Sequence, residues 1–132
     1  MKNVVTIGGG IAGIEASNVL ANLGYNVTII EKEKTHGGKL QNWDHLFPDL
    51  RPASEMREYL DEKIKHENIS VKYKADIEKI ERQNGSLHVY TGNIRYTADA
   101  VLVATGFELF DASRKEEYGY KIYDNVITSA DL

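Results

Sequence analysis

The 132-residue sequence contains no cysteine, and this absence excludes several kinds of redox and metal chemistry. Without a thiol, the chain cannot form disulfides, thiolate metal sites, iron–sulfur cluster ligands or a redox-active dithiol of its own. Basic residues are also few, with 16 Lys and Arg against 20 Asp and Glu, for a net charge of -4. That balance argues against a nucleic-acid partner, because such binders carry a basic surplus.

Long apolar runs are absent as well. No stretch approaches the roughly 20 apolar residues of a membrane helix, and no signal peptide precedes the first predicted strand. We therefore expect no membrane partner and a cytoplasmic location. With 42% hydrophobic and 27% charged residues, the composition is typical of a globular domain. We expect a single domain over residues 1–132, made of a core of residues 1–106 and a tail of residues 107–132.

The stretch of residues 4–31 organises the rest of the chain. Residues 4–7 are apolar or β-branched and precede a glycine run, as a buried parallel strand does. From Ala12 to Leu23 the apolar residues recur at helical spacing, and Gly24 is expected to end the helix. Residues 27–30 predict a second apolar strand. The stretch therefore predicts a complete β–α–β unit.

The glycines of this unit have the spacing of a dinucleotide-binding turn, and each has its own expected role. Gly8 permits the tight turn, Gly10 leaves room for a pyrophosphate, and Gly13 lets helix and strand pack closely. The free amides at the helix start, at Ile11, Ala12 and Gly13, are expected to face the phosphates. The alternative is a glycine-rich turn that serves chain geometry alone.

An acid and a second glycine pair follow the unit. Glu31 lies where a carboxylate accepts hydrogen bonds from ribose hydroxyls, and its position at a strand end predicts little effect on folding. Gly37 and Gly38 permit a positive φ and close contact with a ligand, although an ordinary loop turn is the alternative. Lys32 and Lys39 flank this loop and complete its cofactor-binding candidates. His36 is expected to be a loop residue, because no second histidine or carboxylate has ligand spacing; no metal site is predicted.

The segment after the glycine pair is irregular, and a helix follows it. Trp43 and Phe47 have a spacing that suits the flanks of a flavin ring, but packing onto the core is the favoured interpretation. A helix is predicted over residues 54–66, with Ser54 as its N-cap. Its apolar face is expected to contain Met56, Tyr59, Leu60 and Ile64.

From Ile69 onward the apolar period changes to two, which is typical of strands. Residues 69–73 predict a strand of the parallel sheet, and turn signals at residues 84–85 and 92–93 predict a three-stranded antiparallel meander. The apolar run of residues 100–104 predicts a strand buried on both faces. The predicted fold class is α/β, with a parallel sheet and a three-stranded antiparallel β-meander.

This arrangement resembles the FAD-binding half of the glutathione-reductase-like flavoproteins, a Rossmann-like FAD/NAD(P)-binding domain. The glycine run with its acid, the glycine pair and the ending Ala104-Thr105-Gly106 carry the resemblance. It implies FAD as the cofactor, with NAD(P) less favoured. It further implies that residues 8–13 hold the pyrophosphate and that Glu31 binds the adenosine ribose. Gly37 and Gly38 would approach the pyrophosphate and the ribityl chain, and the backbone around Ile77 would meet the adenine. Ala104, Thr105 and Gly106 would close the site.

A narrower resemblance is to the heterodisulfide reductase A subunits. It rests on residues 7–16 and on the tail from residue 104 to residue 129. Those subunits carry FAD and iron–sulfur clusters and pass electrons between partner subunits. This sequence departs from them in lacking cysteine around residues 47–54, and it stops before the later Gly-Asp segment of the larger class. The chain is therefore expected to be an excised domain of a larger oxidoreductase or a small separate flavin-binding subunit.

Two functions follow from these observations. The first is electron transfer through bound FAD, in which the flavin supplies the chemistry and the protein supplies binding and orientation; no catalytic side chain is assigned. The second is a nucleotide-binding or interaction module without turnover. The apolar residues of the tail and the Trp43 region also predict a protein partner or self-association, unless the tail folds back over its own sheet.

Overall fold

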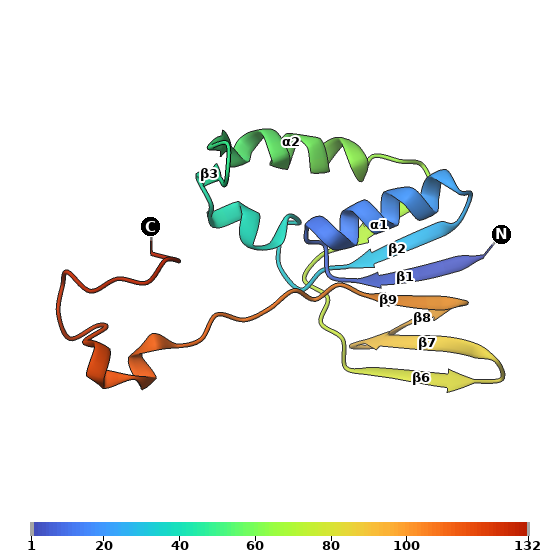
Figure 1. Ribbon diagram of the computed structural model, residues 1–132. Coiled ribbons are helices and arrows are strands. Elements are labelled where there is room, and N and C mark those ends of the chain that lie inside the picture. Colours follow the sequence, from blue (N-terminus) through green and yellow to red (C-terminus); the bar gives the residue numbers. More distant parts are fainter. Residues whose placement is uncertain (1, 132) are drawn as a thin grey trace.

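Four parallel strands form the central sheet of the computed structural model, which describes residues 2–131 (Figure 1). Their order is β5-β2-β1-β9, and all three neighbouring pairs are parallel. The two inner strands, β1 and β2, each carry three large apolar residues among their five, as expected for strands covered on both faces. The four strands are β1 (Asn3–Ile7), β2 (Asn26–Ile30), β5 (Ile69–Lys72) and β9 (Ala100–Val103).

The predicted β–α–β unit is present. Helix α1 (Ile11–Asn22) joins β1 to β2, and Val4 lies beside Val27 in the register of these strands. Gly24 has a φ of 86° and ends the helix, with its amide donating to the carbonyl of Ala21. This left-handed residue is a common helix end that glycine adopts without steric cost. The sequence prediction for this unit is confirmed.

Helices cover one face of the sheet, the upper face in Figure 1. Helix α2 (Ala53–Lys63) and the 3-10 helix η1 (Gly38–Asn42) accompany α1 there. Burial of each large apolar side chain in this layer contributes about 1.5–3 kcal/mol to stability. The cluster beneath the helices consists of Ile14, Ala21, Val27, Ile29, Leu40, Ala53 and Leu60.

The antiparallel meander covers the opposite face. Its two turns are Asn84–Gly85 and Gly92–Asn93, and both residues of the first have positive φ, as a type I′ hairpin requires. Val5, Ile30, Val89 and Ala98 form the core between the meander and the parallel sheet. The meander prediction is confirmed; its strands are β6 (Lys79–Gln83), β7 (Ser86–Thr91) and β8 (Ile94–Ala98).

Strand β9 differs from its prediction as a strand buried on both faces. Among the strands that the structure describes it pairs with β1 alone, so it lies at the edge of the sheet, and its last residue, Val103, is 66% exposed. An apolar run alone does not reveal how many neighbours a strand has. The strand itself was predicted correctly, but its burial was not.

The start and end of α2 also differ from the prediction. The helix begins at Ala53 after Pro52, and Ser54 makes no capping hydrogen bond. Ala53 is fully buried and its amide donates to the carbonyl of Asp44 at 2.8 Å, which satisfies a helix-start donor without a side-chain cap. The helix ends at Lys63 rather than near residue 66, and Tyr59 on its expected apolar face is exposed.

Trp43 and Phe47 do not pack onto the core, so that interpretation was wrong. Trp43 is 43% exposed and Phe47 is 92% exposed. Leu46, between them in sequence, packs against the core instead. Leu46 belongs to a short antiparallel pair of strands, β3 (His45–Leu46) and β4 (Arg51–Pro52).

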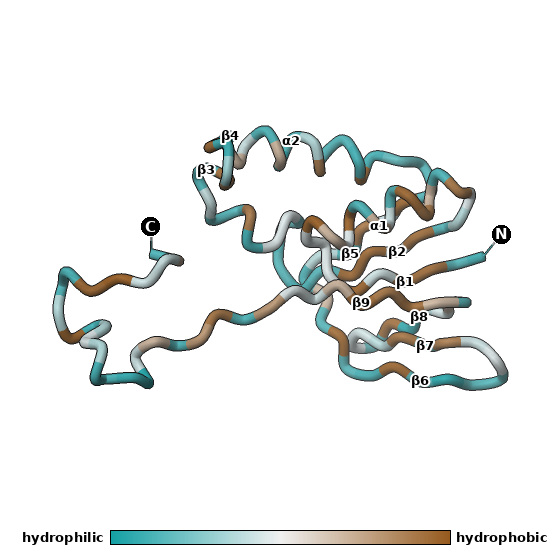
Figure 2. Tube along the Cα trace, in the orientation of Figure 1, coloured by the Kyte–Doolittle hydropathy of each residue, from teal (hydrophilic) through white to brown (hydrophobic). Residues whose placement is uncertain are grey.

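The tail leaves the body beyond the carboxyl ends of the parallel strands and does not fold back over the sheet (Figure 1). Apolar stretches recur along it (Figure 2). No helix within residues 2–131 combines the length and the apolar character needed to cross a bilayer. The tail contains η2 (Ala112–Arg114) and η3 (Glu116–Tyr118), and its exposed apolar residues are Phe107, Leu109, Phe110, Tyr118, Ile122, Tyr123 and Ile127.

Candidate cofactor-binding site

Two glycines at the junction of β1 and α1, Gly8 in the loop and Gly13 in the first turn of the helix, are required by the fold itself. Gly8 has a φ of 102°, and a Cβ on it would overlap the carbonyl oxygen of Ala104. A Cβ on Gly13 would overlap the carbonyl oxygen of Gly8. Backbone atoms cannot move aside as a flexible side chain can. The expected roles of these two glycines, a tight turn and close helix–strand packing, therefore agree with the local geometry.

Gly10 has no such reason to be glycine. Its φ of -79° and ψ of -175° are open to any residue, and no heavy atom lies within 4 Å of the position a Cβ would take. Gly10 is also the N-cap of α1, whose first turn has no side-chain cap and no acidic residue. The amides of Ile11, Ala12 and Gly13 thus lack acceptors within the helix. This open, electropositive helix start fits a phosphate group.

The second glycine pair lies directly against this loop. The amide of Gly37 donates to the carbonyl of Gly9 at 2.6 Å. A Cβ on Gly38 would lie 3.4 Å from the Cα of Gly10. Both residues of the pair have positive φ, 100° and 57°, so the conformation favours glycine at each position. Two loops 28 residues apart in sequence therefore meet at the start of α1.

Glu31 is more deeply built into the site than its position at a strand end suggested. It is 6% exposed, and each carboxylate oxygen accepts a hydrogen bond from a backbone amide. The donors are Gly9, at 2.7 Å from Oε2, and Glu33, at 2.8 Å from Oε1. Each oxygen has a second lone pair that remains available as an acceptor. Because this buried carboxylate joins two loops, the structure predicts a larger effect on folding than the strand-end position alone did.

Replacing Glu31 with alanine should therefore weaken both folding and cofactor binding. The loss of a charged acceptor for two amides predicts a stability loss of about 2–3 kcal/mol. The loss of the ribose acceptor predicts FAD or NAD affinity weaker by about 1–3 kcal/mol. Denaturant unfolding and calorimetric titration measure the two effects. Glu33→Ala is the matched control, and an affinity unchanged in Glu31→Ala would remove Glu31 from the site.

The segment after β9 passes beneath the glycine loop. The amide of Ala104 donates to the carbonyl of Ile7 at 2.8 Å. The Cα of Thr105 lies 3.3 Å from the position that a Cβ added to Gly8 would take. Gly106 has a φ of 71°, which lets the chain turn away into the tail. Ala104 and Thr105 therefore adjoin the glycine loop, and their role in closing the cofactor site stays a prediction.

The remaining predicted site residues lie farther from the glycine loop or face solvent. Lys32 is exposed, and the ammonium of Lys39 lies 5.0 Å from the centre of the Phe107 ring. Ile77 packs on the meander side of the sheet, and its amide donates to its neighbour Asp76. Its adenine contact stays a prediction. No group of three or more His, Asp or Glu that could hold a metal ion occurs within residues 2–131.

Comparison with known protein families assigns this chain to one of them. Residues 2–131 match the family described as pyridine nucleotide-disulphide oxidoreductase. This chain belongs to the pyridine nucleotide-disulphide oxidoreductases. The family contains FAD-binding flavoproteins, which confirms the predicted cofactor at the level of the family. An open Gly10 beside free helix-start amides fits the pyrophosphate of that cofactor.

Similar members of this oxidoreductase family include heterodisulfide reductase subunits. The chain is 26% identical over 219 residues to the A subunit of the ferredoxin/F420H2-dependent CoB-CoM heterodisulfide reductase of Methanosarcina acetivorans, covering 99% of this chain and 27% of that protein. It is 34% identical over 89 residues to a protein of Archaeoglobus profundus described as similar to the heterodisulfide reductase A subunits, covering 67% of this chain and 13% of that protein. The narrower resemblance is thereby confirmed.

A solved structure supports the same fold. The thioredoxin reductase of Lactococcus lactis superposes with a TM-score of 0.72 at 21% identity, covering 91% of this chain and 41% of that protein. The Rossmann-like prediction is confirmed. The chain spans 27% of the length of the Methanosarcina protein, so it represents one part of what that oxidoreductase contains.

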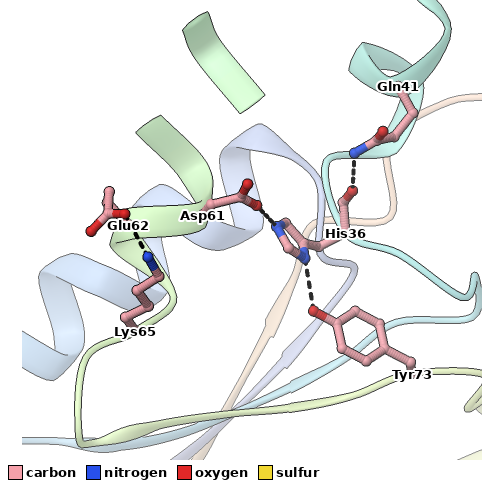
Figure 3. A network of polar contacts seen from close by, with 6 residues as sticks. All are labelled: His36, Gln41, Asp61, Glu62, Lys65 and Tyr73. Atoms are coloured by element: carbon pink, nitrogen blue, oxygen red, sulfur yellow. Dashed lines mark hydrogen bonds and ion pairs between the residues drawn. The ribbon is translucent and has the colours of Figure 1, made fainter. Parts of the chain in front are cut away.

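Sequence reasoning missed one polar network in this oxidoreductase domain. The ring of His36 lies between Asp61 of α2 and Tyr73, the residue that follows β5 (Figure 3). Both partners are more than 20 residues from His36 in sequence, so spacing gave no signal. His36 is a loop residue, as expected, but nothing in the sequence indicated Asp61, which lies 2.6 Å away.

Proposed function

We propose that the glycine loop, Glu31 and the glycine pair bind the pyrophosphate and adenosine ribose of FAD, and that this chain thereby holds a flavin for electron transfer. The observation that carries the proposal is Gly10, whose side-chain position is open although its backbone conformation suits any residue. A ligand that occupies this space accounts for the glycine. The bound flavin supplies the redox chemistry, and the chain supplies binding, orientation and electrostatics.

Charge and hydrogen bonding support a dinucleotide in this orientation. The helix-start amides and the helix dipole stabilise negative charge in front of Gly10. On the other side of Gly9, the buried Glu31 carboxylate offers acceptors to ribose hydroxyls and disfavours a phosphate on the 2′ position. Phosphate and ribose sites thus lie on either side of Gly9, as the pyrophosphate and adenosine of FAD require.

We further propose that the adenine lies toward the segment after β5. The amide of Ala75 donates to the carbonyl of Glu31 at 3.1 Å, so this segment continues from the ribose site. A hollow of about 400 Å³ opens there between the end of β5 and the meander. Its lining includes Tyr73, Asp76, Thr91 and Tyr96, which offer aromatic faces and hydrogen-bonding groups to a base.

The visible absorption spectrum of the purified chain, before and after addition of FAD, tests the proposal. We expect a flavin spectrum that stays with the protein through gel filtration, and weaker retention of NAD. The second glycine pair and Thr105 both adjoin the phosphate loop. In a plain nicotinamide site other segments of the chain take these two positions, so the contacts favour FAD over NAD. A protein that retains NAD but no flavin would contradict the choice of cofactor.

We propose that the tail meets a protein surface, either a partner or a second copy of the chain. Seven large apolar side chains of the tail are exposed, and Phe107 follows directly from the site segment at Gly106. Exposed apolar groups in such number mark interaction surfaces. The relatives from Methanosarcina and Archaeoglobus are named as subunits or subunit-like proteins, which supports a partner.

Light scattering over a range of concentrations tests this surface. We expect the chain alone to self-associate, and the double variant Phe110→Ser/Tyr123→Ser to reduce the association. Glu116→Ser/Glu117→Ser is the matched control on η3, where polar residues are exposed. A chain that stays monomeric at high concentration and also binds FAD tightly would contradict the proposed surface.

A further inference from the structure

We propose that His36 is a positioning residue that fixes the glycine pair against the phosphate loop by bonding to Asp61 and Tyr73 at once. Its effect on cofactor affinity rests on the function proposed above. Its effect on the loop itself does not, and the two can be measured separately.

The geometry of the ring defines its hydrogen bonds. Nε2 lies 2.6 Å from Oδ1 of Asp61, and Nδ1 lies 2.7 Å from the hydroxyl of Tyr73 (Figure 3). A carboxylate only accepts, so Nε2 carries a proton, and in the neutral ring Nδ1 accepts from the Tyr73 hydroxyl. Burial, together with the carboxylates of Asp61 and Glu31, raises the pKa of Tyr73, so the phenol keeps this proton at neutral pH. Both ring nitrogens are satisfied in this state.

These bonds connect three separate parts of the fold. Asp61 belongs to α2, Tyr73 follows the edge strand β5, and His36 belongs to the loop after β2. A ring held from both sides has little freedom to rotate or shift, so its backbone is held as well. The side chain of His36 is 16% exposed, whereas that of Asp61 is 54% exposed. The ring is thus enclosed even though one partner reaches into solvent.

The backbone of His36 passes this constraint to the site. Its carbonyl accepts a hydrogen bond from Nε2 of Gln41 at 2.7 Å. Its Cβ lies 3.4 Å from the position where a side chain on Gly9 would begin, so His36 packs against the phosphate loop. The next residue, Gly37, donates to the carbonyl of Gly9. A displaced His36 ring would therefore loosen the bond that joins the two glycine loops.

The contact with a half-exposed aspartate is screened by water and contributes little to global stability. Its consequence should therefore be local. Hydrogen exchange of the Gly37 amide reports the bond to Gly9 without any ligand, and FAD affinity reports the assembled site. These readouts separate a positioning role from a general contribution to stability, which would accelerate exchange throughout the core.

The experiment compares amide exchange by NMR in the parent chain, His36→Leu and Tyr73→Phe. We expect exchange at Gly37 to be at least about tenfold faster in His36→Leu, with exchange in β1 unchanged, and a smaller local increase in Tyr73→Phe. FAD affinity should fall about fivefold in His36→Leu. Asp61→Asn keeps an acceptor for Nε2 and should behave like the parent. His88→Leu is the control, because His88 lies on the meander and contacts Thr97 there.

Unchanged exchange at Gly37 in both His36→Leu and Tyr73→Phe would overturn the proposal. An increase shared by all core amides would also overturn it, because the role would then be general stability. If His36→Leu does not fold, Tyr73→Phe decides alone, since it removes one hydroxyl and keeps the ring. If the parent chain binds no FAD but the variants still show the local increase at Gly37, the positioning role is supported and the proposed cofactor site is contradicted.

Discussion

The Gly10→Val variant is expected to lose FAD affinity by at least about 100-fold, or about 2.7 kcal/mol, while it still unfolds cooperatively. The valine side chain would occupy the open space in front of the α1 start, which the pyrophosphate needs. The fold should tolerate the valine, because the backbone conformation at Gly10 suits any residue and no heavy atom lies within 4 Å of the position that a Cβ would take. Valine is a poor N-cap, so a stability loss of about 1 kcal/mol is expected.

Gly24→Ala provides a matched control at the other end of the same helix. Its positive φ makes alanine cost about 1 kcal/mol of stability, close to the expected cost of Gly10→Val. Its FAD affinity should equal that of the parent, because Gly24 lies far from the helix start. Calorimetric titration and thermal unfolding of the three proteins give the comparison. Ordinary flavin affinity in Gly10→Val would mean that the pyrophosphate does not bind there.

The Gly13→Ala variant is expected to lose about 2–4 kcal/mol of folding stability. In a typical helix the same change stabilises by about 0.5–1 kcal/mol, so the expected sign is reversed. The reason is that the new methyl group would overlap the carbonyl oxygen of Gly8, which is held between β1 and α1. Either the helix must move off the strand or the tight turn must open.

Denaturant unfolding measures this effect, with Gly10→Ala as the matched control. The same substitution three residues earlier meets no neighbouring atom, and only its poorer N-cap predicts a loss of up to about 1 kcal/mol. A Gly13→Ala protein as stable as Gly10→Ala would show that helix and strand are not packed as closely as described.

Local sequence patterns predicted most of the fold correctly. The β1–α1–β2 unit, the parallel strand β5 and the meander all depend on periodicity within a few residues and on turn glycines with positive φ. The tight turn at Gly8 and the close packing at Gly13 were also predictable, because a spacing of two and then three residues places each glycine at a fixed point of the turn. In these cases the physical cause lies within the segment itself.

The errors concern residues whose surroundings come from elsewhere in the chain. The contact of Glu31 with Gly9 was not foreseen, because this hydrogen bond spans 22 residues of sequence. His36 lacked an assigned partner, because Asp61 and Tyr73 reach it only through tertiary packing. Val103 was expected to be buried, but its strand lies at a sheet edge and the residue is exposed. An apolar run in the sequence does not reveal where in the sheet its strand lies. Sequence patterns specify the residue types in these cases but not their neighbours.

The glycine loops and Glu31 recognise the pyrophosphate and adenosine of FAD in this proposal, and no described contact requires the flavin ring. This distinction separates the proposal from a general affinity for flavins. ADP contains the recognised half, whereas FMN contains the flavin with one phosphate and no adenosine. The two compounds therefore serve as opposite controls for which part of FAD the glycine loops hold.

The measurement that tests the proposed cofactor site most directly is a fluorescence titration of the purified chain with FAD, repeated in the presence of ADP and with FMN in place of FAD. We predict saturable binding of one FAD per chain, competition by ADP, and no saturable binding of FMN. FMN binding as tight as that of FAD, or FAD binding that ADP does not affect, would contradict the assignment of the glycine loops and Glu31 as the cofactor site.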